Sequence, residues 1–527
     1  MKRFEQYFTN LICPVFIFGA ITGIATAIII NLYKFLTKSI IHISETGYSF
    51  LRNHLYWIPL VLIVFWGIAK LFSWLYKKNP RLSGGGIPSS IAILRRIISF
   101  KWLKTLLGVF FMSLVSFLIG VPLGNEGPSV LIGTAVGKGS VDIFAKKHSI
   151  WSKYSMTGGA CAGFSIATGA SLSGILFAVE EAHHRISPMI VAVGCVSVIF
   201  ATITSDIIAP LLNVSTSLFP EIHLIQLSLK DIWIPISLGI IMGIFAVLFL
   251  KYYHLINIFC NKKIKKISSQ LKIFIIFVFT LIIGLISFSC ISTGHELILF
   301  LFVKQKPIYI LLIILLVRTT LTLLANSNKI TGGIFLPILA LGAILSATLA
   351  QTFEIIFSLG HQYYYPILML GITACIASMM KMPLTAIAFS LEALSCHNNI
   401  LHVILVATIS YVITEIFNTK CINDSIVDNI IQTQEETHKL VTIETFVTVQ
   451  KNSFADFMHI KDILWPADFM ILSIQTKQTQ NEENIDTLNA GDILHVRYST
   501  FDDDYTKKEL LAIVGEQDYV KKEMTEP

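Results

Sequence analysis

One short segment, VPLGNEGPSVLIG at residues 121–133, places a carboxylate in an otherwise uncharged stretch of sequence. Its Glu126 is the only charged residue between Lys104 and Lys138. A lone carboxylate at membrane depth costs several kcal/mol unless it has a partner or a function. Glycine permits tight turns and proline suits the first turn of a helix, so we predict a loop that opens into a helix here. A protonatable carboxylate among backbone amides can imitate an anion and leave when it is neutralised.

Two further elements combine glycine and proline in the same way, GGGIPSS at 84–90 and TGGIFLP at 331–337. A helix N-terminus offers free N–H groups and a partial positive charge, which suits a bare anion. Each element alone is better explained by packing or kinking, because glycine and proline are frequent in membrane helices. Together the three elements favour a dehydrated anion that is held by backbone amides.

The composition is that of a polytopic membrane protein. Of 527 residues, 54% are hydrophobic and 14% are charged, and the mean hydropathy is +0.70. A membrane span needs roughly 20 apolar residues. Uncharged runs of that length occur at 11–33, 154–179, 186–205, 232–250, 273–294, 330–353 and 355–380. We interpret the first as a retained helix rather than a cleaved signal peptide, because its uncharged stretch is too long for a typical signal sequence.

The net charge of +7 does not indicate nucleic-acid binding. The basic residues fall in short clusters at the ends of apolar runs, as expected for cytoplasmic loops; these are Lys2-Arg3, Lys146-Lys147, Lys262-Lys263 and Lys265-Lys266. Eight cysteines are dispersed without metal-ligand or disulfide spacing, so we expect small buried side chains. No metal site and no cofactor are predicted.

The membrane part contains an internal repeat. GNEGPSVLIG at 124–133 and GIFLPILALG at 333–342 share Gly, Pro and Gly at the same offsets. SLSGILFAVEE at 171–181 and PLTAIAFSLEA at 383–393 form a second pair at nearly the same separation. Repeated segments that Gly and Pro interrupt point to a transport site at the membrane midplane, built from broken helices.

The composition changes near residue 420, and the remaining chain is predicted to form a small soluble α+β domain. TIETFVTVQ and DFMILSIQT are typical of strands, and NAGDILHVRYS of a turn followed by a strand. ADFMHIKDIL at 455–464 is predicted to be a helix. We place this domain at 441–520.

The three glycine and proline elements resemble the signature motifs of the CLC family of chloride channels and proton-coupled chloride exchangers. In the family they are written GSGIP, GxEGP and GxFxP, and they occur here in that order. The resemblance covers about residues 10–430, and we take 1–430 as a transmembrane anion transport domain. It implies an all-α polytopic membrane protein with two inverted-topology repeats of tilted and broken helices. It also implies a homodimer with a separate pathway in each subunit.

The resemblance assigns roles to individual residues. Glu126 matches the gating glutamate, which occupies an anion site when ionised and moves out when protonated. Gly86, Ile87, Ile334 and Phe335 would supply backbone N–H groups to the anion, with Gly85 and Pro88 in the same loop. Phe335 would also line the pathway.

Glu181 matches a second, internal glutamate that passes protons to the cytoplasm in family exchangers and that family channels usually lack. Its presence favours exchange over a passive channel. The alternative is an acid at a helix end that pairs with Arg185 or another cation. Glu180 has a repeat partner in Glu392, so we expect Glu180 to be structural.

Three departures from the family pattern bear on selectivity. Gly85 stands where the family commonly has serine, and Asn423 stands where a tyrosine hydroxyl would complete the anion site. Asn125 replaces an arginine, a form associated with the fluoride-exporting branch, although that branch usually has methionine at position 85. Chloride preference and tight proton coupling are therefore open questions at the level of sequence.

Other readings of the sequence are weaker. Glu180 with His183 and Glu181 with His184 have metal-ligand spacing, but a di-iron bundle needs two inward-facing copies with further carboxylates. No nucleotide-binding loop and no nucleophile elbow occurs, so neither an ATP-driven pump nor an enzyme is expected. The tail resembles the ligand-binding C-terminal domain of potassium-transport regulators of the RCK/TrkA type, which implies a cytoplasmic module for a small ligand or for assembly.

We therefore predict an anion/proton antiporter in the inner membrane of a prokaryote-like cell, carrying chloride or a related anion. Two rival interpretations remain. One is a passive, voltage- or pH-gated chloride channel. The other is an anion sensor that signals through its tail.

Overall fold

The computed structural model describes residues 12–145, 150–184, 186–260, 266–435, 440–466, 468–476, 487–517 and 521–524. The helices of the first half are α2 (Cys13–Asn53), α3 (Ile58–Lys78), α4 (Ile87–Leu94), α5 (Trp102–Ile119), α6 (Glu126–Phe144), α7 (Ile150–Thr168), α8 (Ser171–Phe177) and α9 (Pro188–Leu211). Those of the second half are α10 (Trp233–Ile258), α11 (Ser269–Ile286), α12 (His295–Val303), α13 (Ile308–Ser327), α14 (Phe335–Phe357), α15 (Tyr364–Met379), α16 (Pro383–Ala393), α17 (Ile400–Ile416) and α18 (Ile422–Glu435).

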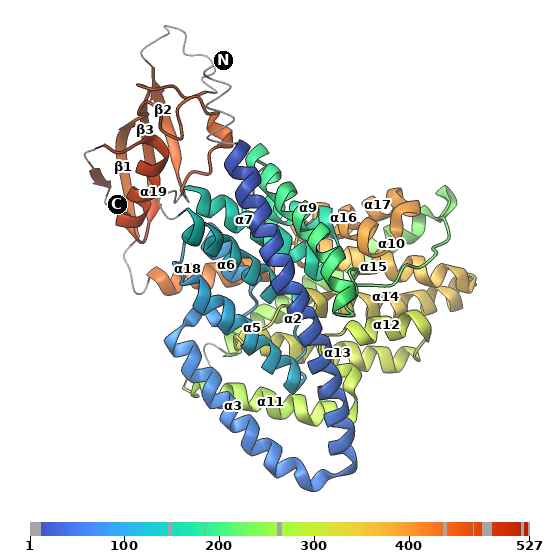
Figure 1. Cartoon of the computed structure of the whole chain (residues 1–527). Coiled ribbons are helices and arrows are strands. Elements are labelled where there is room, and N and C mark those ends of the chain that lie inside the picture. Colours follow the sequence, from blue (N-terminus) through green and yellow to red (C-terminus); the bar gives the residue numbers. More distant parts are fainter. Residues whose placement is uncertain are drawn as a thin grey trace.

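The helices pack into one all-α body in which α2 runs across the surface as one long rod (Figure 1). Within the described ranges, nine helices are long and apolar enough to cross a membrane. Others are shorter or broken, and α6, α7, α14 and α15 form the buried centre. Small residues lie where these helices meet, for example Gly133 of α6 against Gly159 of α7. Such residues let helix backbones approach closely. The expectation of a polytopic all-α membrane protein built from tilted and broken helices is confirmed.

The uncharged runs locate most of the spanning helices but not their ends. The run at 154–179 contains parts of two helices, α7 and α8, because the helix ends at Gly169, whose φ is 70°. The run at 273–294 continues past the end of α11 at Ile286. Of the basic clusters at the ends of the runs, Lys2-Arg3, Lys146-Lys147, Lys262-Lys263 and Lys265 lie outside the described residues.

The repeat appears in the order of the helices, since α6 to α9 correspond to α14 to α17. Two glutamates tie the halves together at corresponding places. Glu180 accepts hydrogen bonds from the amides of Leu384 (3.0 Å) and Thr385 (2.8 Å) at the start of α16. Glu392 accepts from Leu172 (2.8 Å) and Ser173 (3.1 Å) at the start of α8. Each half therefore caps a helix of the other, and Glu180 is structural, as expected from its repeat partner.

The polar segment after residue 420 begins with α18, which packs against α4 of the membrane part. The small domain then follows, with a four-stranded sheet in the order β2-β3-β1-β4 whose neighbouring strands are antiparallel. Its elements are β1 (Val441–Thr448), β2 (Met470–Gln475), β3 (Ile493–Thr500), α19 (Asp503–Val514) and β4 (Lys521–Met524).

One prediction for this domain is wrong. Instead of a helix at 455–464 there is only a 3-10 turn, η10 (Ile460–Asp462). The backbone of the segment bonds elsewhere: Ala455 N–H donates to Ile513 (2.9 Å) and Phe457 N–H to Leu488 (2.8 Å). The helix of the domain is α19, whose N-cap Asp502 accepts from Tyr505 N–H (3.1 Å).

The small domain contacts the membrane part at the start of α7, as Figure 1 shows. The Tyr154 hydroxyl donates to the carbonyl of Asp462 (3.0 Å) and accepts from Leu464 N–H (3.0 Å). Lys153 donates to the carbonyl of Trp465 (2.6 Å). At a second point, Arg96 at the end of α4 lies 3.6 Å from the carboxylate of Glu509 on α19.

The reciprocal caps give a first prediction. In Glu392→Ala the amides at the start of α8 lose their acceptor, so the free energy of unfolding falls by about 1 kcal/mol. The midpoint of thermal unfolding of the purified protein in detergent measures the change. Glu221→Ala, which removes an exposed acid from a loop, should leave the midpoint in place. Equal midpoints for the Glu392 variant and the native protein would contradict the cap.

Candidate functional site

The three glycine and proline loops meet in the interior, where backbone hydrogen bonds join them. Gly124 and Gly333 exchange hydrogen bonds, with N···O distances of 2.6 and 2.7 Å. Gly84 donates to the carbonyl of Lys329 (2.9 Å) and accepts from Gly332 N–H (3.3 Å). Loops that lie far apart in the sequence thus form one junction, from which α4, α6 and α14 begin.

The junction needs glycine because the backbones are in contact. A side chain on Gly127 would collide with the carbonyl of Gly85 and come within 2.8 Å of Gly333. Gly86 has a φ of 79°, and a side chain there would meet the carbonyl of Gly127. Gly85 differs from both, since its nearest neighbours would be Pro88 at 3.6 Å and Gly332 at 3.7 Å, an ordinary contact distance.

The N-termini of the three helices lack side-chain caps. Their N-cap residues are Gly86, Asn125 and Ile334, and none of these side chains bonds to its helix. Within the described part of the chain, the amides of Gly86, Ile334 and Phe335 donate to no other group. Ile87 differs, because its amide donates to the carbonyl of Gly85 (3.0 Å). Free amides at membrane depth are costly, and together they form a site of positive potential.

Glu126 is the first residue of α6 and is fully buried at this junction. Its carboxylate lies beside the Cα of Gly124, next to Leu336 and Pro337 in the first turn of α14. Neither oxygen has a hydrogen-bond partner among the described residues. The basic residues nearest in charge interaction to it are His295 and Lys34. A carboxylate buried without a partner is a group poised to move or to be neutralised.

Phe335, the first residue of α14, lies in a cluster of aromatic rings. Its ring packs edge-on against Phe164 (5.2 Å between centroids) and Phe389 (5.6 Å). Phe164 in turn stacks on Phe177 (5.1 Å). These buried rings surround the first residue of α14 with apolar side chains.

A cavity of about 410 Å³ reaches the junction from the side of α18. Gly84, Gly85 and Pro88 line its inner end together with Asn326, whose side-chain oxygen is buried and has no partner among the described residues. Its outer part is lined by residues of α18 and by Lys272 and Lys329, which are basic. The cavity thus joins a positively charged surface to the loop at Gly85.

Glu181 lies in the π-helical segment η4 (Ala178–Ala182), away from the junction, and is buried. Its side chain accepts a hydrogen bond from the Asn423 amide (2.9 Å), and its backbone carbonyl accepts one from Arg95 (3.0 Å). The predicted alternative partner, Arg185, lies outside the described residues.

Asn423 thus contacts Glu181 through its side-chain amide. The family resemblance places Asn423 at an anion-site hydroxyl, and no feature of the sequence indicates this contact, because the two residues are 242 positions apart. The next residue, Asp424, lies 3.6 Å from the ring of His184. The start of α18 is thus fastened to the segment after α8 at two points.

The side chains of the two ExxH pairs have partners within the protein. The Glu180 carboxylate caps α16, and the His183 ring lies 2.9 Å from the Thr157 hydroxyl. His184 bonds to the backbone carbonyl of Glu180 (2.7 Å). Each side chain has a structural partner of its own.

Known proteins show the same sequence features and the same fold. The family model described as voltage gated chloride channel matches residues 60–415. The H(+)/Cl(-) exchange transporter ClcA of Salmonella arizonae is 29% identical over 352 residues, which are 66% of this chain and 74% of that protein.

Solved structures agree on the architecture. A slow cyanobacterial Cl-/H+ antiporter superposes with a TM-score of 0.72 at 23% identity, over 80% of this chain and 99% of the other. A CLC-type fluoride/proton antiporter superposes with a TM-score of 0.62 at 16% identity, over 77% of this chain and 96% of the other. The expected fold, with two inverted repeats, is confirmed.

The contact between glycines generates a second prediction. In Gly127→Ala the new methyl group meets the Gly85 carbonyl, and overpacking lowers the free energy of unfolding by about 1–3 kcal/mol. Gly85→Ser should cost far less, because its side chain has room. Thermal unfolding of both variants in detergent measures the difference.

The matched control is Gly67→Ala in α3, where the added methyl group meets nothing within 4 Å. Alanine also favours a helix, so this variant should be as stable as the native protein or more so. If Gly127→Ala unfolded at the same temperature as Gly67→Ala, the close contact at the junction would be wrong.

Proposed function

The chain belongs to the voltage gated chloride channel family, and from this membership we propose that it exchanges chloride or a related small anion for protons across a membrane. The observation that carries the proposal is the placement of Glu126. This buried carboxylate has no hydrogen-bond partner among the described residues and lies where α6 and α14 both begin. A relative, the ClcA exchanger, is named for proton and chloride exchange.

In the proposed cycle Glu126 and the anion compete for the same amides. The ionised carboxylate is attracted to the helix N-termini, as a bound anion would be. Protonation removes its charge and with it the competition, so the anion enters as the side chain leaves. No hydrogen bond of ordinary geometry holds the side chain among the described residues, although the backbone amide of Leu336 lies close to its carboxylate.

The proposed anion site consists of the Gly86, Ile334 and Phe335 amides, with the loop at Gly85 and Pro88 facing the cavity. These amides are free among the described residues, and Gly85 and Pro88 line the inner end of the cavity. The Ile87 amide would join them only after releasing the Gly85 carbonyl. Asn423 is not part of this site in our proposal, since its amide group serves Glu181.

We assign proton transfer on the side of α18 to Glu181. It is buried, yet it lies beside the start of α18 and near the ion pair of His184 with Asp424. The Asn423 amide can donate to an ionised carboxylate and also to the carbonyl oxygen of a protonated one. The hydrogen bond therefore holds the side chain in place through both states, as a proton carrier requires.

Gly85 offers the anion no side-chain donor, so we propose that backbone N–H groups determine which anion binds. With no hydroxyl at this position, the described junction offers a halide mainly N–H groups. Such a site discriminates by size and hydration more than by side-chain hydrogen bonds, so chloride, nitrate and fluoride should be compared side by side. A fluoride/proton antiporter is among the proteins with this fold.

A third prediction tests the exchange. In liposomes with an imposed anion gradient, the native protein should move protons against their gradient. Glu126→Gln should keep anion flux and lose proton movement, because the side chain can no longer take up a proton. Glu181→Gln should lower the proton flux by roughly a hundredfold, a typical effect of removing a positioned proton-transfer group. Recording both fluxes at once gives the coupling.

The control is Glu45→Gln, which removes an exposed carboxylate from α2 and should leave both fluxes unchanged. Native anion flux with no proton movement would favour the passive channel instead. Proton movement that survives in Glu126→Gln would show that another group carries the proton.

We propose two functional parts, an anion transport domain at 1–430 and a regulatory domain at 441–520, of which residues 467, 477–486 and 518–520 lie outside the described ones. The adjacent residues Arg95 and Arg96 support coupling between them. Arg95 donates to the backbone carbonyls of Glu181 and Ala182, while Arg96 faces Glu509 of the small domain. The residues that follow α4 thus contact both Glu181 of the proposed proton route and Glu509 of the proposed regulatory domain.

The remaining proposals concern assembly and location. We place the protein in the inner membrane as a homodimer, with one pathway in each subunit and the small domain in the cytoplasm. That domain would bind a small ligand or support assembly, as its likeness to RCK/TrkA-type domains suggests. Size-exclusion chromatography with light scattering measures the mass of the purified assembly.

A fourth prediction separates a transporter from a sensor. Truncation after residue 435 removes the small domain and leaves the junction, Glu126 and Glu181 in place. A regulated transporter should still exchange anions for protons, with an altered rate because Arg96 loses its contact. Flux in liposomes measures this. A truncated protein that is folded, as judged by its elution volume, but inactive would contradict the assignment of transport to residues 1–430.

A further inference from the structure

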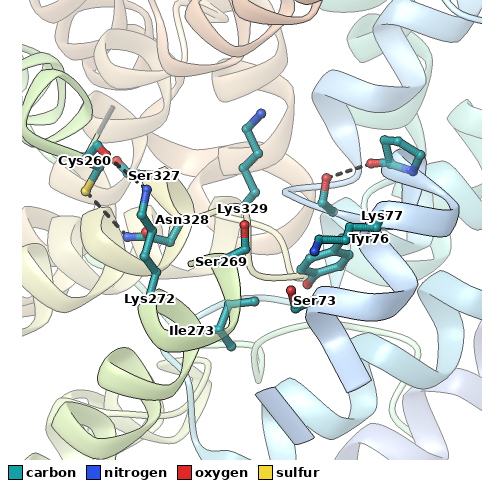
Figure 2. Close-up of a pocket in the computed structure, with 12 residues that line it drawn as sticks. Ser73, Tyr76, Lys77, Cys260, Ser269, Lys272, Ile273, Ser327, Asn328 and Lys329 are labelled. Carbon is teal, nitrogen blue, oxygen red and sulfur yellow. Dashed lines mark hydrogen bonds between the residues drawn. The ribbon is translucent and has the colours of Figure 1, made fainter. Parts of the chain in front are cut away.

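A second cavity, of about 330 Å³, lies between α3, α11 and the end of α13 (Figure 2). Tyr76 and Lys77 enter it from one side, and Cys260 and Lys272 from the other. Ser327, the last residue of α13, and Lys329, two residues later, also line it. The spanning helices α3, α11 and α13 each have an end here, so the pocket lies where membrane spans meet water.

The pocket is positively charged. Lys77, Lys272 and Lys329 line it, and no carboxylate is found among the lining residues that the structure describes. Like charges around a common space repel one another, and an anion between them relieves that repulsion. One lysine is already oriented, since the ammonium group of Lys272 donates to the carbonyl of Cys260 (3.3 Å).

Neutral donors converge on the same space. The α11 helix begins here at Ser269, whose amide has no acceptor among the described residues, while the Ser268 hydroxyl already accepts from Leu271 N–H (3.3 Å). The Ser327 hydroxyl lines the pocket, is buried with 8% of the residue exposed, and has no partner among the described residues. A buried hydroxyl without a partner is expensive, so a ligand that bonds to it is favoured.

From this set of groups we propose that the pocket bounded by Lys77, Lys272, Lys329 and Ser327 binds a phosphate group, carried by an acidic lipid or by a soluble phosphate compound. Several oxygens on one centre can accept from more than one ammonium group, a hydroxyl and a helix amide together. A single halide ion cannot bridge donors spread around a cavity of this size. Basic pockets between membrane helices are typical sites for acidic headgroups.

The position of the pocket gives its occupant access to the transport site. Lys329, which has a φ of 58°, accepts a hydrogen bond from Gly84 through its carbonyl (2.9 Å). Lys272, Ser327 and Lys329 also line the larger cavity that leads to Gly85. A phosphate bound by Lys329 would therefore contact a residue whose backbone is hydrogen-bonded to Gly84, in the loop of the proposed anion site.

The fifth prediction concerns binding by the full-length protein in a neutral detergent. Two probes are titrated separately, pyrophosphate and phosphatidylglycerol, with potassium chloride at matched ionic strength and phosphatidylcholine as references. At least one probe should raise the midpoint of thermal unfolding saturably. Pyrophosphate alone would identify a soluble ligand, and phosphatidylglycerol alone a lipid. In Lys77→Ala and in Lys272→Ala the dissociation constant should rise about tenfold, because each loses a charged hydrogen bond.

The matched control is Lys78→Ala. Lys78 is the next residue of α3 but lies over the Trp74 ring, 5.0 Å from its centroid, and does not line the pocket. Lys77→Arg, which keeps the charge, should retain binding. The proposal fails if neither probe exceeds its reference, or if Lys78→Ala weakens binding as much as Lys77→Ala does. Binding is read without any transport measurement, so it stands or falls independently of anion exchange.

Discussion

The reciprocal hydrogen bonds between Gly124 and Gly333 are the constraint on which the site depends. They join a loop of the first half to the corresponding loop of the second, and only residues without side chains allow the backbones to come so close. Once joined, α6 and α14 begin at the same point with uncapped amides. Water is scarce at membrane depth, so these amides must find an anion or a carboxylate. Glu126 lies at this point, buried and without a hydrogen-bond partner among the described residues.

Much of this fold could be predicted from the sequence because membrane spans leave a simple signal. The uncharged runs locate α2, α9, α10 and α14. They miss α3, α5, α13 and α17, and the uncharged run in α13 is interrupted by Arg318. That arginine is fully buried and donates to the carbonyls of Ser289, Ile291 and Ser292. Long-range partners of this kind make a charge tolerable inside a membrane protein, and periodicity cannot reveal them.

The site was predictable in its loops and not in its contacts. Glycine and proline mark where α4, α6 and α14 begin, because backbone geometry requires those residue types locally. The partner of Glu181 was not predictable, since Asn423 reaches it from the start of α18, far along the chain. The predicted helix at 455–464 does not form for the same reason, because amides of this segment donate to carbonyls that are distant in the sequence. Local propensity gives way where the tertiary structure offers better acceptors.

The exchanged caps of Glu180 and Glu392 have a consequence for biosynthesis. When the ribosome has made α8, the glutamate that completes its N-terminus has not yet been translated. Until residue 392 is synthesised, the amides of Leu172 and Ser173 lack the acceptor that they have in the complete protein. Its final stability is therefore acquired only after translation of the second half, which makes the two halves a single unit for folding and for quality control.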